Sequence, residues 1–213
     1  TDPIPLNEGC FRPLHIVLPE GSFLAPRPGS AVVAGNTEVS QAICNALLGA
    51  LGTVASSQGT MNNFLFGNDV YQYYETIGGG AGAGRAFDGA SAVHTHMTNT
   101  RLTDPEILEL RYPVRVEQTA IRRNSGGTGR HRGGDGMVRA LRFLEPMTAT
   151  LVSSRRRVAP FGMAGGGDGA PGRQWVTRAN GTHEDVDGCG SIAIGTGDLI
   201  VIETPGGGGF GSK

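Results

Sequence analysis

Residues 73–84 read Tyr-Tyr-Glu-Thr-Ile-Gly-Gly-Gly-Ala-Gly-Ala-Gly, which joins an aromatic and β-branched stretch to a run dominated by glycine. The aromatic part favours a β-strand, which we expect over residues 70–77. Glycine has no Cβ, so the loop that follows can bring backbone N–H groups close to a small ligand. We therefore predict a strand that leads into a ligand-binding loop at Gly78, Gly79 and Gly80.

This loop is flanked by polar residues of kinds that a solvated linker would not carry. His94 and His96 stand two positions apart, so their side chains share one face if the segment is extended. We predict that Glu75, His94 and His96 are the catalytic candidates. The amides that could orient a small polar substrate are those of Asn62, Asn63 and Asn99.

The two histidines admit several roles. They could act as a general acid or base, or donate to an oxyanion. They could also be structural, donating to backbone carbonyls, or they could bind a metal with Glu75 or Asp88 as a third ligand. Two histidines supply only two ligands and the spacing fixes no third, so we assign no metal ligand in this chain.

Composition excludes several classes of function. The formal net charge is −1 over 213 residues, which gives no electrostatic reason to expect nucleic acid or an anionic membrane as a partner. No apolar run approaches the length of a membrane span. The single lysine is Lys213, and no GxxxxGK[ST] motif exists, so a P-loop for ATP is excluded.

The cysteines indicate the compartment. Cys10, Cys44 and Cys189 are odd in number and widely spaced, with no CxxC pattern. Such thiols are typical of a reducing environment, and we predict that the protein is cytoplasmic.

The expected fold class is α+β. A mixed, glycine-rich site region covers residues 1–110, and an antiparallel β-rich region with long glycine-rich turns covers residues 111–213. A helix is predicted at about 36–51, with Ser40, Gln41 and Asn45 facing solvent or a partner. Strands are predicted over 61–66, 70–77, 112–121, 137–144, 148–153, 174–179 and 191–203, with a short helix over 107–110 and a hairpin turn at 180–181.

Residues 125–136 contain little apolar material and several cationic side chains. We interpret them as a surface loop, which could be an anion-binding nest or simply a long hairpin connection.

Seven motifs in register resemble the hydantoinase B / 5-oxoprolinase family over essentially the whole chain. They lie at residues 5–13, 35–41, 57–63, 74–80, 94–101, 125–136 and 204–211. Because family B subunits are considerably longer, the chain resembles their C-terminal part.

The resemblance implies an ATP-dependent cyclic amidase that acts on a lactam or imide. In such systems a hydantoinase A-type ATPase subunit or domain binds ATP and phosphorylates the amide oxygen. The B component then opens the activated ring with water. The resemblance also implies a divalent metal bound upstream of this chain, in the N-terminal half of the B subunit, so we expect the fragment alone to be inactive.

Two other functions stay open. Related family members are carboxylases of acetone-like ketones, which use the same phosphorylation step. Alternatively, this part of the subunit is a non-catalytic scaffold for the metal-bearing half and the ATPase.

Overall fold

The computed structural model describes residues 7–32 and 35–213. The chain divides into two units, residues 1–33 and 34–213. The described part of the first unit holds one short 3-10 helix, η1 (Glu8–Phe11), whose first turn is capped by the Asn7 side chain accepting from the Gly9 N–H at 2.9 Å. All further elements belong to the second unit.

The second unit contains two α-helices and nine strands in its described residues. In chain order the elements are η2 (Gly35–Val39), α1 (Ser40–Ala50), β1 (Asn63–Gly67), β2 (Gln72–Thr76), α2 (Pro105–Arg111), β3 (Val114–Arg122), β4 (Gly136–Phe143), β5 (Met147–Val152), β6 (Arg173–Thr177), β7 (His183–Asp185), β8 (Cys189–Ile194) and β9 (Leu199–Glu203).

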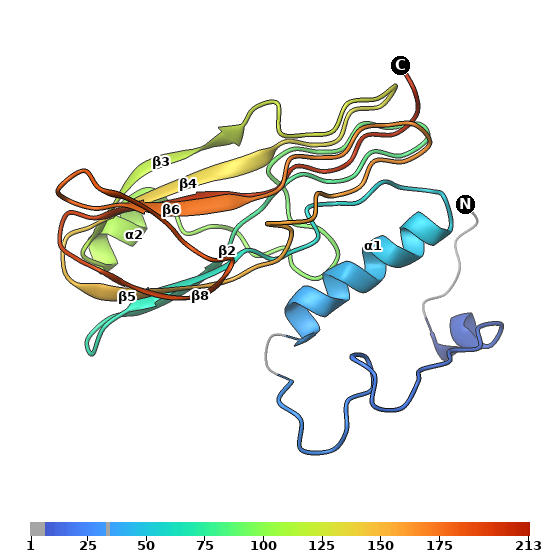
Figure 1. The fold of residues 1–213 in the computed structure, drawn as a ribbon, viewed down its shortest axis with the longest axis horizontal. Helices are drawn as coiled ribbons and strands as arrows, with labels where there is room; N and C mark the ends of the chain where they lie inside the picture. Colours follow the sequence, from blue (N-terminus) through green and yellow to red (C-terminus); the bar gives the residue numbers. More distant parts are fainter. Residues whose placement is uncertain (1–6, 33–34) are drawn as a thin grey trace. The chain divides into compact units, whose positions relative to one another are not determined.

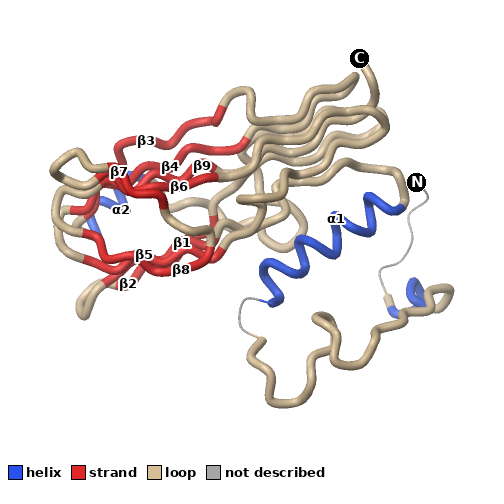
Figure 2. Tube along the Cα trace, viewed as in Figure 1, coloured by secondary structure: helices blue, strands red, loops and turns tan. Residues whose placement is uncertain are grey.

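The strands form two antiparallel sheets, drawn in red as two layers in Figure 2. One sheet has the order β2-β1-β5-β8 and the other has the order β3-β4-β9-β6-β7. The first sheet combines β1 and β2 from before residue 110 with β5 and β8 from after it, so the two sequence regions share a sheet. The α+β class is confirmed.

The hydrophobic core lies between the sheets. Phe64 and Phe66 of β1 are buried with Leu141 and Phe143 of β4, and Leu108 of α2 joins the same cluster. The rings of Phe66 and Phe143 meet edge to face with centroids 5.2 Å apart. These alternating apolar positions explain why the strands form where the sequence predicts them.

The prediction of one continuous strand over residues 191–203 is wrong. The chain turns at residues 195–198, where the Asp198 side chain accepts from the Gly195 N–H at 2.8 Å and Gly197 has φ +88°. A positive φ is readily accessible to glycine and breaks the strand. As a result β8 and β9 lie in different sheets. The hairpin predicted at 180–181 is confirmed between β6 and β7, with Gly181 at φ +86°.

Beyond the strands, glycine-rich segments continue side by side in an extended bundle (Figures 1 and 2). Main-chain hydrogen bonds join residues 78–84, 126–136, 161–170 and 205–211. A Cβ at Gly80 would collide with backbone atoms of Gly134 and Gly207. The prediction that residues 125–136 form a surface loop is wrong for Gly133 and Gly134, because their missing side chains let them pack inside this bundle. The alternative, a long hairpin connection, is confirmed, because the segment joins the antiparallel strands β3 and β4.

Helix α1 is oriented opposite to the prediction. Gln41 and Asn45 are 0% and 1% exposed, whereas Leu47 and Leu51 are 59% and 73% exposed. The prediction that Ser40, Gln41 and Asn45 face solvent or a partner is wrong for the two amides, which are buried and hydrogen-bond to other segments of the second unit. Within residues 35–213, no element covers the apolar side.

Candidate functional site

Glu75 of β2 lies in the core. It is 5% exposed, and its carboxylate accepts from Arg139 of β4, with Nε to Oε1 at 3.1 Å and Nη2 to Oε2 at 3.2 Å. Arg139 also donates from Nη1 to the Thr119 hydroxyl at 2.7 Å. The carboxylate is therefore engaged in a buried ion pair that joins the two sheets.

Tyr73 completes this cluster. Its hydroxyl donates to Glu75 Oε2 at 2.9 Å and lies 2.9 Å from the Thr103 hydroxyl. Burial, followed by the charge of Glu75, raises the pKa of Tyr73 to about 12. The phenol therefore stays protonated at neutral pH and holds the carboxylate in place.

His94 lies in a different environment, beside a cavity of about 380 Å³. The cavity lies next to the glycine-rich loop, and its lining comprises Gly78, Ala92, Val93, His94, Asn99, Thr100, Arg101, Leu102 and Met137. Three of the predicted site residues, His94, Gly78 and Asn99, are thus brought together around one small, mainly apolar space. This combination of a concave apolar wall with few polar groups is typical of a small-molecule site.

One nitrogen of the His94 imidazole lacks a hydrogen-bond partner. This nitrogen is Nδ1, and it is buried. Burial lowers the pKa of His94, and the backbone of Thr100 opposes this shift in part. The ring is therefore neutral at pH 7, and an Nδ1 without a proton could accept a hydrogen bond from a bound molecule.

His96 contacts a separate polar cluster, which we call the α1 amide cluster, formed by Gln41, Asn45, Ser57, Thr95 and His96. Nε2 of His96 lies 3.3 Å from the Ser57 hydroxyl and 3.3 Å from Asn45 Oδ1. Gln41 donates to the Thr95 carbonyl at 2.6 Å, and the Ser57 N–H donates to Asn45 Oδ1 at 2.9 Å. These contacts fix helix α1 to the segments on either side of the glycine loop.

The two imidazoles therefore share no hydrogen-bond partner. His96 has φ +60°, which turns the backbone between them away from a regular strand. The extended arrangement on which the shared face depended is absent. Burial also lowers the pKa of His96, although the residue is exposed overall.

Asn62 and Asn63 are buried and hydrogen-bonded within the protein. Asn62 donates to Gln58 Oε1 at 2.7 Å and accepts from Arg156 Nη1 at 2.7 Å. Asn63 donates to Glu38 Oε1 at 3.0 Å. Their amides hold neighbouring segments in position.

Two of the three glycines predicted to approach a ligand also have occupied N–H groups. The Gly79 N–H donates to the Val93 carbonyl at 2.9 Å, and the Gly80 N–H donates to the Pro205 carbonyl at 3.0 Å. This leaves Gly78 as the member of the trio that lines the His94 cavity.

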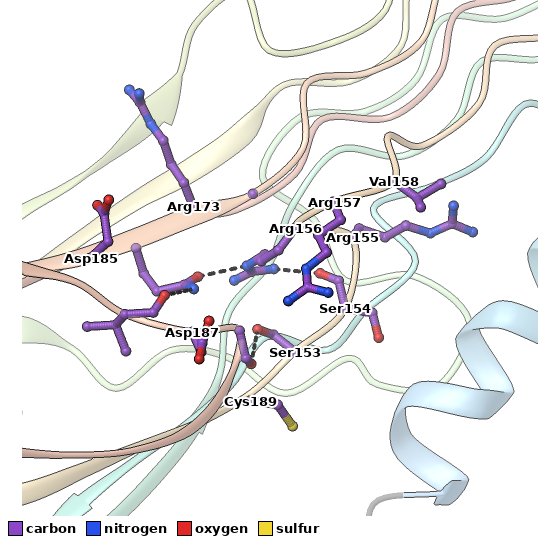
Figure 3. Close-up of a pocket in the computed structure, with 14 residues that line it drawn as sticks. Ser153, Ser154, Arg155, Arg156, Arg157, Val158, Arg173, Asp185, Asp187 and Cys189 are labelled. Carbon is purple, nitrogen blue, oxygen red and sulfur yellow. Dashed lines mark hydrogen bonds between the residues drawn. The ribbon is translucent and has the colours of Figure 1, made fainter.

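A larger cavity of about 830 Å³ lies elsewhere in the second unit, lined by residues 153–158, 172–174 and 185–189 (Figure 3). Arg156 is its most buried cation, and burial lowers the pKa of Arg156 to about 10. The sequence by itself indicates no role for Arg156. The run Arg155-Arg156-Arg157 was visible as a local cationic cluster, but nothing in the sequence shows that its middle member turns inward.

Within the described residues, no group of three or more His, Cys, Asp and Glu side chains is placed to hold a metal ion. The described residues therefore offer no donor set for a divalent metal, which the family resemblance places upstream of this chain. No helix in the described part of the chain is both long and apolar enough to cross a membrane.

Comparison with known proteins identifies a matching family model and relatives that cover nearly all of this chain. The family model described as Hydantoinase B/oxoprolinase matches residues 1–213. The chain is 47% identical to 5-oxoprolinase 1 of Arabidopsis thaliana over 210 residues, which is 99% of this chain and 17% of that protein. The chain thus spans about a sixth of that relative's length.

Two solved structures share the fold. The ATP-dependent caprolactamase from Pseudomonas jessenii matches with a TM-score of 0.66 and 27% identity, over 75% of this chain and 30% of that one. A nucleotide-free acetone carboxylase matches with a TM-score of 0.62 and 20% identity, over 74% and 26% respectively. From the family model and the extent of the sequence identity, the chain belongs to the hydantoinase B/oxoprolinase family.

Proposed function

We propose that this chain is part of the B component of an ATP-dependent cyclic amidase of the 5-oxoprolinase or hydantoinase type, and that the His94 cavity receives the phosphorylated lactam or imide. The observation that carries the proposal is His94, which lines a cavity with Gly78 and Asn99 and whose buried Nδ1 has no hydrogen-bond partner. A buried polar atom without a partner is costly unless a ligand or water satisfies it.

The chemistry follows from the neutral imidazole. Nδ1 accepts a proton from water as the water oxygen bonds to the activated ring carbon. The ring opens when the carbon–nitrogen bond breaks and the leaving nitrogen takes the proton held by His94, which leaves an acyl phosphate. A second water hydrolyses this acyl phosphate to a carboxylate and inorganic phosphate. The Asn99 amide is suited to orienting the substrate. Among the three predicted catalytic residues, His94 takes the direct role. Glu75 and His96 support the site by holding the β2 strand and helix α1.

ATP is supplied by a hydantoinase A-type ATPase subunit or domain, and a divalent metal is held upstream of this chain. Support comes from the ATP-dependent caprolactamase, which shares the fold, and from the sequence, which carries no P-loop motif. The described residues do not fit a metal, so no step here depends on one.

The rest of the longer protein, with the N-terminal half of the B subunit as the candidate, covers the apolar side of α1 in a hetero-oligomeric assembly. Leu47 and Leu51 are exposed there, and the chain spans only 17% of the plant relative. Leu47→Glu should weaken association of the halves when they are expressed separately and measured by size-exclusion chromatography. Unchanged association would remove α1 from the interface.

We place the protein in the cytoplasm. Cys44 and Cys189 carry free thiols, which supports a reducing compartment.

The test is His94→Gln in the full-length protein with its ATPase partner, assayed for opening of 5-oxoproline and release of phosphate. We expect turnover to fall by about 10²–10⁴-fold, the usual contribution of a general base. The matched control is His183→Gln, because His183 is exposed on β7. Unchanged turnover with intact assembly would instead establish a scaffold.

The same preparation distinguishes the carboxylase alternative. A ketone carboxylase would hydrolyse ATP in a bicarbonate-dependent manner with acetone or acetophenone as substrate. We expect ATP turnover to depend on a lactam or imide and to be indifferent to bicarbonate.

A further inference from the structure

The large cavity of Figure 3 is distinct from the His94 cavity, since the two share no lining residue. It opens between the segment that follows β5, the start of β6 and the β7–β8 connection. Its charged lining residues are four arginines, Arg155, Arg156, Arg157 and Arg173, and two aspartates, Asp185 and Asp187.

Two of the four arginines bind other groups of the protein. Arg173 forms an ion pair with Glu203, with Nε to Oε2 at 2.6 Å, and Arg155 donates from Nη1 to the Ala159 carbonyl at 3.3 Å. In Figure 3 the side chains of Arg155 and Arg173 point outward, away from Arg156. The fourth, Arg157, is exposed, whereas Nη2 of Arg156 is buried, so Arg156 is the cation of the inner part of the cavity.

Every hydrogen bond that Arg156 makes in the described structure goes to a neutral oxygen. Nε donates to Gln174 Oε1 at 2.7 Å, and Nη1 donates to Asn62 Oδ1 at 2.7 Å and to the Ser154 carbonyl at 2.9 Å. The third nitrogen, Nη2, is buried and has no partner. Two N–H donors of a buried guanidinium are thus left over.

The arrangement is held rigidly. Gln174, 4% exposed, is fixed by donating from Nε2 to the Val186 carbonyl at 2.6 Å. Asn62, 0% exposed, is fixed by its bonds to Gln58 and to the Ile77 carbonyl. Arg156 is therefore oriented before any ligand arrives, which lowers the entropic cost of binding.

Glu38 acts on Arg156 through its charge, but every described hydrogen bond of the guanidinium goes to a neutral group. A buried cation without a counter-ion in hydrogen-bond contact is costly, and a bound anion removes much of that cost. We propose that this cavity is a binding site for a small oxyanion, a carboxylate or a phosphoryl group, held by Nη2 of Arg156. Charge-assisted bonds from a guanidinium suit both kinds of oxygen. Asp185 and Asp187 at the lining disfavour anions of high charge. This site does not depend on the role of His94.

The experiment is isothermal titration of the full-length protein with two probes, inorganic phosphate and glutarate. We expect Arg156→Met to weaken binding by about 10–100-fold, the effect of losing charge-assisted hydrogen bonds. Arg123→Gln is the matched control, because Arg123 is an exposed arginine outside the cavity lining.

A second variant guards against misfolding of Arg156→Met. Gln174→Glu places a carboxylate against Nε of Arg156 and so supplies an internal counter-ion while the arginine stays. The proposal expects weaker binding here too, with His94→Gln unaffected. Binding of phosphate alone, or of glutarate alone, identifies the oxyanion. The proposal is overturned if neither probe binds the natural protein, or if both variants bind as the natural protein does.

Discussion

Glu75 and Arg139 form a buried ion pair that links the two sheets, with Arg139 Nε 3.1 Å from Glu75 Oε1. The side chain of Arg139 is 1% exposed and that of Glu75 is 4% exposed. The pair connects β2 of the four-stranded sheet to β4 of the five-stranded sheet. A carboxylate that the sequence presents as a catalytic candidate is thus placed where it stabilises the relation between two layers.

Glu75→Gln should destabilise the protein by about 3–5 kcal/mol, because it leaves the Arg139 guanidinium buried without its counter-ion. Urea-induced unfolding of the variant measures this. The double variant Glu75→Leu with Arg139→Met should lose less folding free energy than Glu75→Gln, since it removes both buried charges. A stable but inactive Glu75→Gln would contradict this prediction and restore a catalytic role for Glu75.

Gly80→Ala should destabilise the fold by about 1–3 kcal/mol or more, because its Cβ would collide with the backbone of Gly134 and Gly207. Gly190→Ala is the matched control: its Cβ would enter open space, and the change should stay within about 0.5 kcal/mol. Differential unfolding of the two variants checks this. Equal stabilities would mean that the glycine bundle yields to a methyl group at no cost.

Asn45→Ala should cost about 1–3 kcal/mol, because it leaves the buried Ser57 N–H without its acceptor. Ala46→Ser, one position along α1 on an exposed site, should change stability by less than about 0.5 kcal/mol. Chemical unfolding provides the comparison. A neutral Asn45→Ala would show that the amide side of α1 is not what attaches the helix.

Stability should fall on acidification, because burial lowers the pKa values of His94 and His96 below 6.5. The unfolded chain, with ordinary pKa values near 6.5, takes up protons at a higher pH than the folded chain. The stabilisation is therefore present above pH 6.5. It is lost as the pH falls from there through the lowered folded-state values.

Unfolding free energies measured at several values from pH 8 to pH 5 test the sign. Replacing both histidines by glutamine should flatten the slope in this window. A natural protein that gained stability below pH 6.5 would show that the imidazoles prefer their charged form in the folded state.

The main elements of the fold follow from sequence periodicity. The run at 114–122 and the run at 136–143 alternate or concentrate apolar residues, and they form β3 and β4 as antiparallel partners. The pairing of β1 with β5, in which Gly67 lies opposite Thr148 and Asn63 lies opposite Val152, was not predictable because it depends on long-range register.

The site was predicted less completely. His94, Gly78 and Asn99 do line one cavity, because they lie within a short span of chain that folds back on itself. Glu75 and Arg139 could not be paired from sequence, since 64 positions separate them. The inward turn of Arg156 depends on Asn62, 94 positions away, for the same reason.

By itself, the amino-acid sequence determined the α+β class and the positions of most strands, because these depend on local patterns of apolar residues and glycine. The resemblance to the family came from seven motifs in register along the chain. Only the tertiary structure decided which polar groups have hydrogen-bond partners within the protein and which do not. It buried the amides of α1 and paired Glu75 with Arg139. It left His94 Nδ1 and Arg156 Nη2 without partners. Whether a polar atom is satisfied depends on residues distant in the chain, and only folding brings them together.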